Sequence, residues 1–563
     1  MRTRIWISRR LTWGFYTRAD RVGGRSRLAV VAAALRRRAA AGPLAIAIVV
    51  VVAAGAGCDV IGGSGSGPSA STEGGEATRR VERKATNPPP GLPAAFTAGQ
   101  RLDWSACPAP SGAQGGGDAP GDGWECATMK APLDYERPGR DTIDVAMIRK
   151  RATGPERKRI GSLLLNFGGP GQSGVVGLPR FAGDYAPLGE RYDLVSFDPR
   201  GIGGTAPVIC GKKKYEGGDA CEKHSGGLLP YVGTSQTARD MDLMRYLLGD
   251  EKLHYFGVSY GTRLGGVYAH LFPKNVGRLV LEAPIDPTLD RLQGEISQVK
   301  AVQLAFDRFA EHCANAYDDC PTGSGPEQAG QRVIELLDKL EKKPAPTDGD
   351  EELDDSLAAH AIANHLDRGK EGWRPLAKAL REVMERGTGS KLLEEAYDHG
   401  PDTQSRRARA DAGVGVSARS KTSGGNGTSA FVAITCADSN LRPGFTKSEE
   451  MTKRIEAASP VFGETWAIGV YLCYDWPFKG ESATPDVSAD GASPILVVAN
   501  TGDPTTPYGG AKRMAGELGE EVGVLLTVRA EGHGSYPFNR CATRAVNTYL
   551  LDGTTPGYGT TCS

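Results

Sequence analysis

Leu253-His-Tyr-Phe-Gly-Val-Ser-Tyr-Gly261 is the stretch that decides how this chain folds. The apolar residues 253–256 predict a buried strand, and the amphipathic residues 262–271 predict a helix. Between them lies a Gly-x-Ser-x-Gly pattern, which is typical of a tight turn that lifts a serine hydroxyl clear of the sheet, above the N-terminus of the helix. The pattern predicts Ser259 as a nucleophile; the alternative is a surface turn with an idle serine.

The same alternation of apolar strands and amphipathic helices surrounds this stretch. Strands are predicted at residues 161–167, 192–197 and 278–282, and the pattern returns at 494–499 and 522–528. It indicates an α/β fold with a mostly parallel sheet. From Pro287 to about residue 490 the pattern is instead mainly helical. We therefore expect one sheet domain, residues 101–286 and 491–563, interrupted by a helical cap insertion at 287–490.

An acid and a base follow Ser259 in the order that this kind of site requires. Asp503 lies in Gly502-Asp-Pro-Thr-Thr-Pro507, directly after a predicted strand, and His533 lies in Glu531-Gly-His-Gly534, after the next one. Residues that face ligands gather at the C-terminal ends of such strands. We expect His533 to take the proton of Ser259 and Asp503 to orient the imidazole. The alternative is a surface histidine and an aspartate in a turn.

A developing oxyanion needs two backbone N–H donors. One is expected from Tyr260, the residue after the nucleophile. The other is expected from the loop Phe167-Gly-Gly-Pro-Gly171, at Gly169, because glycines let the backbone approach a substrate closely. The alternative for this loop is a plain turn between a strand and a helix.

The N-terminal region looks like an export signal followed by a linker. Arg36, Arg37 and Arg38 precede an apolar run at residues 44–54, which is too short for a comfortable membrane span. The run ends at Gly55-Ala-Gly-Cys58, which resembles a bacterial lipobox with glycine where leucine is usual. We expect residues 1–57 to be a leader, Cys58 to be acylated, and the Gly/Ser-rich residues 58–100 to be a flexible tether with the lipid anchor at its start. Simple cleavage nearby is the alternative to acylation, and either a twin-arginine-like leader or a misassigned start codon explains the long basic beginning.

The eleven cysteines fit an exported protein with one cysteine set apart. Without Cys58, the other ten can pair as sequence neighbours, although ten cysteines allow many schemes. The neighbour pairs are Cys107–Cys126, Cys210–Cys221, Cys313–Cys320, Cys436–Cys473 and Cys541–Cys562.

Composition narrows the possible partners. The chain has 67 basic and 67 acidic residues, which gives no overall electrostatic reason to bind nucleic acid. It has no Cys-x-x-Cys pair and only eight histidines, a weak basis for a metal site. We expect no metal and no cofactor.

Several of these motifs together resemble the tripeptidyl aminopeptidase family of bacterial exported α/β-hydrolases, relatives of the prolyl aminopeptidases. The resemblance runs from about Leu102 to the C-terminus and is weakest through the cap. Phe167 departs from it, because proline or histidine is usual there, and this affects the shape of the substrate pocket beside it. Glu282 departs as a tolerated replacement for the aspartate of a Leu-Asp-Gly run. The similar motifs are Asn166-Phe-Gly-Gly-Pro-Gly-Gln-Ser-Gly174, Phe197-Asp-Pro-Arg-Gly-Ile-Gly203, Thr237-Ala-Arg-Asp-Met-Asp242, Tyr255-Phe-Gly-Val-Ser-Tyr-Gly-Thr262, Ile434-Thr-Cys-Ala-Asp438 and Asp503-Pro-Thr-Thr-Pro507.

The resemblance implies an α/β-hydrolase fold and removal of short peptides from free N-termini, on the outer face of the cell membrane or in secreted form. Peptides or proteins would then be the substrates, and a lipid anchor would link the chain to the membrane. A carboxylate should hold the substrate's α-amine, and Asp438 is our candidate among many acids of the cap. A carboxylesterase or lipase with the same triad is the nearest alternative. A lipid-anchored binding protein on an inactive hydrolase scaffold is the alternative from another class. A dehalogenase is excluded, because the turn holds Ser259 rather than an aspartate.

Overall fold

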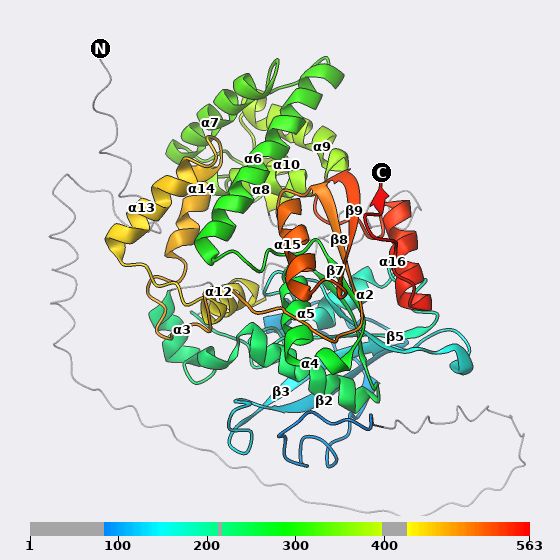
Figure 1. Cartoon of the computed structure of the whole chain (residues 1–563). Helices are drawn as coiled ribbons and strands as arrows, with labels where there is room; N and C mark the ends of the chain where they lie inside the picture. The colour runs from blue at the N-terminus through cyan, green and yellow to red at the C-terminus, as the bar shows by residue number, and fades with distance from the viewer. Residues whose placement is uncertain (1–83, 212–216, 397–424) are drawn as a thin grey trace, which may run out of the picture. The chain divides into compact units, whose positions relative to one another are not determined.

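A single sheet of ten strands organises the chain, as seen in a computed structural model that describes residues 84–211, 217–396 and 425–563 (Figure 1). The strand order is β1-β2-β3-β5-β4-β6-β7-β8-β9-β10. The pairs from β1 to β5 are antiparallel, and all pairs from β5 to β10 are parallel. The strands are β1 (Ser105–Ala106), β2 (Trp124–Pro132), β3 (Thr142–Lys150), β4 (Gly161–Asn166), β5 (Tyr192–Phe197), β6 (Leu253–Val258), β7 (Val276–Glu282), β8 (Ile495–Gly502), β9 (Gly523–Glu531) and β10 (Thr561–Cys562). This arrangement confirms the predicted α/β fold with a mostly parallel sheet.

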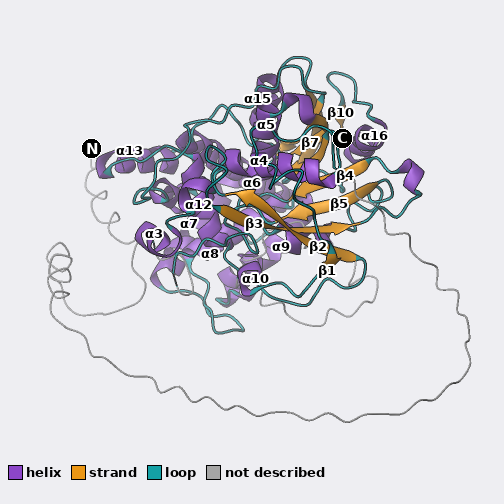
Figure 2. Ribbon diagram, turned by 90° about the horizontal axis from the view of Figure 1, so that it is seen from below, coloured by secondary structure: helices purple, strands orange, loops and turns teal. Residues whose placement is uncertain are grey.

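Both faces of the sheet are buried, because successive side chains of each strand point to opposite faces. Leu164 belongs to the apolar cluster on one face, whereas Leu163 and Leu165 belong to the cluster on the other. Helices α4 (Thr234–Leu248), α5 (Tyr260–Leu271) and α15 (Tyr508–Leu518) complete the first cluster. Helices α2 (Gly174–Phe181) and α16 (Arg540–Asp552) complete the second, and Figure 2 shows the strands running between helices.

The helical insertion lies between β7 and β8 and has an apolar core of its own. Phe306, Phe309 and Phe462 are fully buried in that core, with leucines and alanines of the neighbouring helices. Figure 1 shows these helices gathered to one side of the sheet. The insertion contains α6 (Arg291–Ala316), α7 (Pro326–Lys342), α8 (Asp355–Asp367), α9 (Lys370–Arg381), the π-helix η5 (Glu382–Arg386), α10 (Ser390–Ala396), α12 (Gly427–Asp438), α13 (Phe445–Glu456), α14 (Gly463–Ala467) and the 3-10 helix η6 (Ile468–Tyr471).

Helix α12 differs from the other helices of the insertion, because it packs on loops of the sheet domain. Its residues share an apolar cluster with Ile202, Val208 and Tyr260. Asn426, at its N-terminus, accepts a hydrogen bond from Gly203 N–H (3.0 Å) and donates to the carbonyl oxygen of Gly201 (2.7 Å). The remaining short helices lie in the sheet domain: η1 (Gly112–Gln114), η2 (Glu156–Lys158), α3 (Gly218–Ser225), η3 (Leu229–Tyr231) and η4 (Pro273–Asn275).

The folded domain begins earlier than the sequence suggested. The predicted tether ended at residue 100, but residues 84–100 pack on the sheet domain. Phe96 is buried in the main core, and the backbone N–H of Ala85 donates to Tyr246 O at 3.1 Å. The buried Arg245 donates to both the side chain and the backbone oxygen of Asn87 (2.8 Å each). Residues 84–100 are held against the sheet domain because they accept the hydrogen bonds of the buried Arg245 guanidinium. The composition of the segment does not reveal such a contact.

Five disulfides are formed, and they are the five neighbour pairs that the sequence allowed: Cys107–Cys126, Cys210–Cys221, Cys313–Cys320, Cys436–Cys473 and Cys541–Cys562. The predicted leader and Cys58 lie outside the described residues. Within the described ranges, no helix combines the length and the apolar composition that crossing a membrane requires.

Candidate active site

Ser259 occupies a strained turn between β6 and α5. Its backbone lies at φ 55° and ψ −118°, a region that non-glycine residues rarely adopt. Gly257 and Gly261 make the turn possible, because a methyl group on Gly257 would lie 2.4 Å from the carbonyl oxygen of Gly261. The N–H of Ser259 donates to the carbonyl oxygen of Glu282 at 3.0 Å, which ties the turn to the end of β7. The structure therefore has the sharp strand-to-helix turn that the motif predicted.

Asp503 and His533 lie side by side at the ends of β8 and β9. Nδ1 of His533 is 2.9 Å and 3.0 Å from the two carboxylate oxygens of Asp503. The Asp503 side chain is completely buried and also accepts hydrogen bonds from the N–H groups of Thr505 (2.9 Å) and Thr506 (2.8 Å). The hydroxyl of Thr506 donates to it as well (3.1 Å). A carboxylate held this firmly fixes the imidazole with its proton on Nδ1 and leaves Nε2 available as a base.

Two buried side chains that the sequence analysis did not assign to the site hold the loop of His533, residues 531–536. Asn500 donates to the carbonyl oxygens of Gly532 and Gly534 (2.8 Å each). The carboxylate of Glu282 accepts from the backbone N–H groups of Ser535 and, at 3.4 Å, Tyr536. Because the backbone of Glu282 also holds Ser259, this residue joins the turn of the nucleophile to the loop of the base. The one sequence signal for Glu282 was its position at the end of a predicted strand, where the resembling family carries an aspartate.

The charges around His533 favour its protonated form. Burial by itself would lower the pKa of His533, but the charge and hydrogen bond of Asp503, followed by the charges of Asp367 and Glu282, raise it to about 9. Burial raises the pKa of the Glu282 carboxyl to about 7, against the lowering effect of its backbone hydrogen bonds. An imidazolium formed at this position is therefore stabilised from three sides.

The glycine loop after β4 lies against the nucleophile. A methyl group on Gly168 would lie 2.6 Å from Val258 O and 3.1 Å from the Ser259 Cβ, so the loop and the turn are in direct contact. The N–H of Gly168 donates to the Asn166 side chain at 3.1 Å. By contrast, the N–H groups of Gly169 and Tyr260 have no acceptor among the described residues. An oxyanion hole needs N–H groups without a protein acceptor, so Gly169 and Tyr260 stay the predicted donors.

Phe167 packs on apolar residues beneath the glycine loop, and its effect on the shape of the substrate pocket stays a prediction. Its ring packs against Phe181 on α2 (5.0 Å between ring centroids) and near Tyr185 (6.3 Å). A methyl group on Gly177 would lie 2.8 Å from the ring. The ring therefore fills the apolar layer beneath the loop, which a large apolar residue stabilises by burial.

Asp438 is joined to the nucleophile's turn by a chain of hydrogen bonds. It is the last residue of α12, and its carboxylate accepts from the N–H (2.7 Å) and hydroxyl (2.6 Å) of Thr234. The Thr234 hydroxyl is 2.7 Å from the hydroxyl of Tyr260. Arg263 lies 3.3 Å from the same carboxylate. With both oxygens engaged, Asp438 supports Tyr260; its role in binding a substrate amine stays a prediction.

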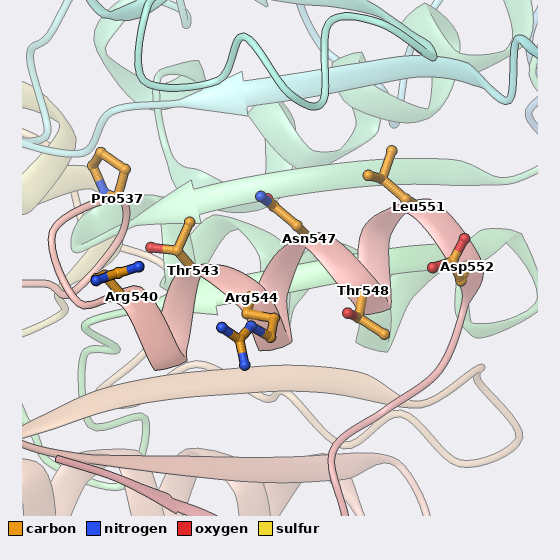
Figure 3. Close-up of a pocket in the computed structure, with 8 residues that line it drawn as sticks. All are labelled: Pro537, Arg540, Thr543, Arg544, Asn547, Thr548, Leu551 and Asp552. Carbon is orange, nitrogen blue, oxygen red and sulfur yellow. The ribbon is translucent and has the colours of Figure 1, made fainter.

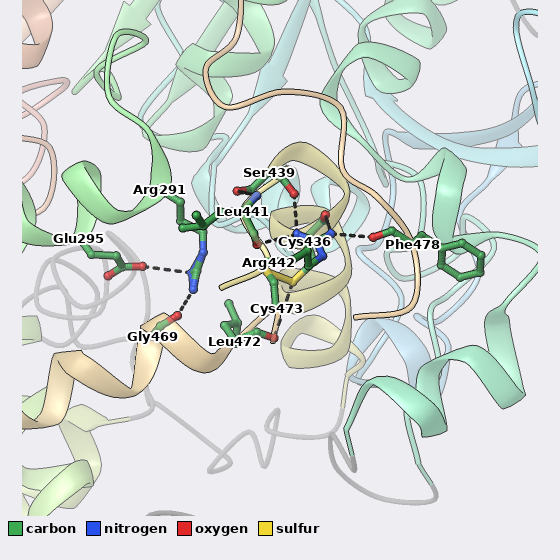
Figure 4. Close-up of a disulfide and its surroundings, with 10 residues drawn as sticks. All are labelled: Arg291, Glu295, Cys436, Ser439, Leu441, Arg442, Gly469, Leu472, Cys473 and Phe478. Atoms are coloured by element: carbon green, nitrogen blue, oxygen red, sulfur yellow. Dashed lines mark hydrogen bonds and ion pairs between the residues drawn. A yellow bond between two sulfur atoms is a disulfide. The ribbon is translucent and has the colours of Figure 1, made fainter. Parts of the chain in front are cut away.

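The end of α12 that carries Asp438 is fixed from two directions (Figure 4). The Cys436–Cys473 disulfide ties it to the segment after η6. Arg442 then folds back and donates to the carbonyl oxygen of Cys436 in the last turn of the helix (2.6 Å) and to that of Phe478 in the segment after Cys473 (2.8 Å). A guanidinium suits this place, because the last carbonyl groups of a helix lack partners within the helix.

A groove on the surface lies away from the candidate catalytic residues. The groove along α16 carries a mixture of polar and charged side chains but none of Ser259, Asp503 and His533 (Figure 3). Across the described part of the chain, no cluster of three or more His, Cys, Asp or Glu side chains could hold a metal ion. The groove is lined by Pro537, Arg540, Thr543, Arg544, Asn547, Thr548, Leu551 and Asp552.

Known proteins match this chain over most of its length. Serine protease Hip1 of Mycobacterium tuberculosis is 32% identical over 511 residues, which cover 82% of this chain and 91% of the relative. Tripeptidyl aminopeptidase of Streptomyces lividans is 28% identical over 553 residues, 90% of this chain and 94% of the relative. Carboxylesterase B of Mycobacterium tuberculosis is 30% identical over 472 residues, 78% of this chain and 86% of the relative.

Two family models match within the sheet domain and its insertion. Residues 161–348 match the alpha/beta hydrolase fold, and residues 459–562 match the TAP-like protein family. The first region carries the Ser259 turn, and the second carries Asp503 and His533. These matches, the extent of the relatives and the observed sheet lead to one conclusion. The chain belongs to the tripeptidyl aminopeptidase-like family of α/β-hydrolases and is a serine hydrolase.

Proposed function

We propose that this enzyme is an exported peptidase that releases di- and tripeptides from free N-termini. The observation that carries the proposal is the pairing of His533 with the buried Asp503, in a loop that Glu282 joins to the strained turn of Ser259. The names of two relatives, a serine protease and a tripeptidyl aminopeptidase, favour peptides as the substrates.

The reaction proceeds through an acyl-enzyme. The Ser259 hydroxyl attacks the peptide carbonyl carbon as Nε2 of His533 takes its proton, and the oxyanion is held by the N–H groups of Tyr260 and Gly169. The C–N bond then breaks, and His533 gives its proton to the leaving amine. Water next attacks the ester carbon as His533 takes its proton, and the bond to Ser259 breaks as His533 returns that proton to the serine oxygen and the peptide acid is released. Asp503 stabilises the imidazolium in both halves.

Matched substrates test the peptidase proposal. We expect the purified enzyme to cleave tripeptidyl-aminomethylcoumarins with a free N-terminus about a hundredfold faster, by kcat/KM, than their N-acetylated forms. The reason is that acetylation leaves the amine-binding carboxylate buried and unpaired. Equal values would exclude recognition of the free amine.

A carboxylesterase is the second candidate, favoured by the 30% identity to Carboxylesterase B. Short acyl esters of p-nitrophenol, assayed beside the peptides, separate the two. Efficient ester hydrolysis without peptide hydrolysis would replace the peptidase proposal, while loss of both activities in Ser259→Ala would still identify the nucleophile.

Export and anchoring form the remaining part of the proposal. The five disulfides support an oxidising compartment, and Cys58 is the proposed site of acylation. We expect the Cys58→Ala protein to leave the membrane fraction of an expressing cell and to escape globomycin-sensitive processing. Unchanged membrane retention would argue against the lipid anchor.

A further inference from the structure

The cap touches the loop of His533 where α8 ends. The backbone N–H of His533 donates to the backbone carbonyl oxygen of Asp367, the last residue of α8, at 2.7 Å. A methyl group on Gly369 would lie 2.3 Å from Glu531 O, and one on Gly532 would lie 2.7 Å from Gly369 N. The two backbones are therefore in direct contact, because no side chain fits between them.

The side chain of the same residue reaches the loop of Asp503. The hydroxyl of Thr505 donates to Oδ1 of Asp367 at 2.6 Å, and the N–H of Thr505 donates to Asp503 at 2.9 Å. Asp367 thus binds the loop of the base with its backbone and the loop of the acid with its side chain. Neither Asp503 nor His533 is near Asp367 in the sequence, so the contact exists only because the cap folds back onto the sheet.

Asp367 also adds a charge beside the imidazole. Three carboxylates face His533: Asp503 after β8, Glu282 at the end of β7, and Asp367 from the cap. Burial raises the pKa of the Asp367 carboxyl to about 6, against the lowering effects of the His533 charge and the Thr505 hydrogen bond. At neutral pH the carboxylate is therefore mostly ionised. Glu531, also in this loop, is paired with Arg308 of α6 at 2.9 Å.

We propose that Asp367 is a positioning residue supplied by the cap, which sets the loops of Asp503 and His533 against each other and stabilises the protonated imidazole. The inference rests on the proposed role of His533 as the base, and it adds a cap residue to a site whose reacting groups come from the sheet domain. The cap then contributes a residue that positions and stabilises the reacting groups.

Asp367→Asn tests the charge, because asparagine keeps an oxygen for Thr505 and removes the negative charge. The readout is the rate at which a fluorophosphonate modifies Ser259 in the full-length enzyme, measured from pH 5 to 10. This rate reports the ionisation of His533 whatever the natural substrate is. We expect the midpoint of the profile to fall by about one pH unit.

Thr505→Val tests the positioning, because it removes the hydroxyl donor and leaves every charge in place. We expect the maximal rate to fall by about tenfold with an unmoved midpoint, and Thr505→Ser to restore it. Glu531→Gln is the matched control. It breaks the Arg308–Glu531 ion pair between the cap and the same loop, and we expect no shift of the midpoint.

The outcomes separate this inference from the proposed function. If Ser259 is not modified in the parent enzyme, both are overturned. If Ser259 is modified and the midpoint is the same in Asp367→Asn and Glu531→Gln, Asp367 only fastens the cap. Should Asp367→Asn fail to fold, as judged by circular dichroism, the Thr505 pair decides: a loss in Thr505→Val that Thr505→Ser does not rescue would overturn the positioning role.

Discussion

The sheet domain and the helical cap contribute to the site in different ways. In the sheet domain, each candidate reacting group follows the end of one strand: Ser259 follows β6, Asp503 follows β8 and His533 follows β9. The cap reaches these groups through helix ends, with Asp367 at the end of α8 and Asp438 at the end of α12. The parallel strands place these groups after their C-terminal ends, and Asp367 of the cap binds the loops of Asp503 and His533.

Reacting groups and supporting groups therefore reach the site by different routes. A strand end in a parallel sheet delivers its side chain to a fixed edge, so the position of a reacting group follows from its own strand. A helix end in a cap reaches the site only after the helices pack around their own apolar core. Substitutions in the two regions test this division.

Ser259→Ala should remove the nucleophile that the sheet domain supplies. We expect kcat to fall by roughly a factor of 10⁶, the size of effect seen when a serine nucleophile is removed, with little change in the melting temperature. Fluorophosphonate labelling and peptide hydrolysis measure the loss. Ser225→Ala is the control, because the hydroxyl of this half-buried serine binds the backbone of Ile209. Full labelling of Ser259→Ala would place the nucleophile elsewhere.

Gly168→Ala should disturb the contact between the glycine loop and the Ser259 turn. Its methyl group would lie 2.6 Å from Val258 O, so the loop must move and carry the N–H of Gly169 away from the oxyanion. We expect kcat to fall by about 10²–10³-fold, as for the loss of one oxyanion donor.

Gly123→Ala is the matched control for that variant. Gly123 also has a positive φ, 83° against 88° for Gly168, but a methyl group there meets open space. Both variants carry the backbone strain, and only Gly168→Ala carries the clash. Equal activities would mean that the glycine loop does not shape the oxyanion site.

The pH profile should show the combined effect of carboxylates from both regions. A protonated His533 cannot take the proton of Ser259, and its pKa is raised to about 9. We therefore expect kcat/KM to rise with pH between 7 and 9, by up to about tenfold per unit.

Glu282→Gln measures how much a carboxylate of the sheet domain raises the pKa of His533, apart from the carboxylate of the cap. Removing this buried carboxylate should lower the midpoint of the profile, because its charge favours the imidazolium. A plateau that already begins near the ordinary histidine pKa of about 6.5 in the parent enzyme would show that the surrounding carboxylates have little effect.

Tyr260→Phe should have the smallest effect, because it cuts the link between the oxyanion site and α12 without removing a reacting group. Thr234 donates its hydroxyl proton to Asp438, so the hydroxyl of Tyr260 must donate to Thr234. Without this hydrogen bond, the ring at position 260 is held less firmly, and we expect kcat to fall about tenfold. The free energy of unfolding should fall by about 1 kcal/mol, because the hydrogen bond is lost.

Tyr268→Phe is the control on the same helix. Its hydroxyl is also buried and donates to a carboxylate, Asp242, at 3.1 Å. We expect a similar loss of stability, measured by denaturant unfolding, with unchanged kcat. If both variants lower kcat equally, the link from Tyr260 to Asp438 has no special role in the reaction.

Features that depend on neighbours along the chain could be predicted from the residues alone. Residues 253–256 predicted β6 because a short apolar run favours a buried strand, and Gly257 and Gly261 predicted the turn of Ser259 because only small residues fit there. Asp503 and His533 were found from their places after predicted strands, and they prove to be hydrogen-bonded. The five pairs of neighbouring cysteines were one scheme that the sequence allowed, and the structure forms all five of them.

The distant residues that support these groups could not be predicted, because they are brought there by packing between elements far apart in the chain. Glu282 looked like a tolerated replacement, and its contacts with Ser535 and Tyr536 appear only when β7 and β9 lie two places apart in one sheet. Asp367 meets His533 because the cap packs back onto the sheet domain across a long stretch of sequence. The sequence around a helical aspartate is the same whether its carboxylate faces water or a buried imidazole. Its role is therefore fixed by packing between elements, which local periodicity does not encode.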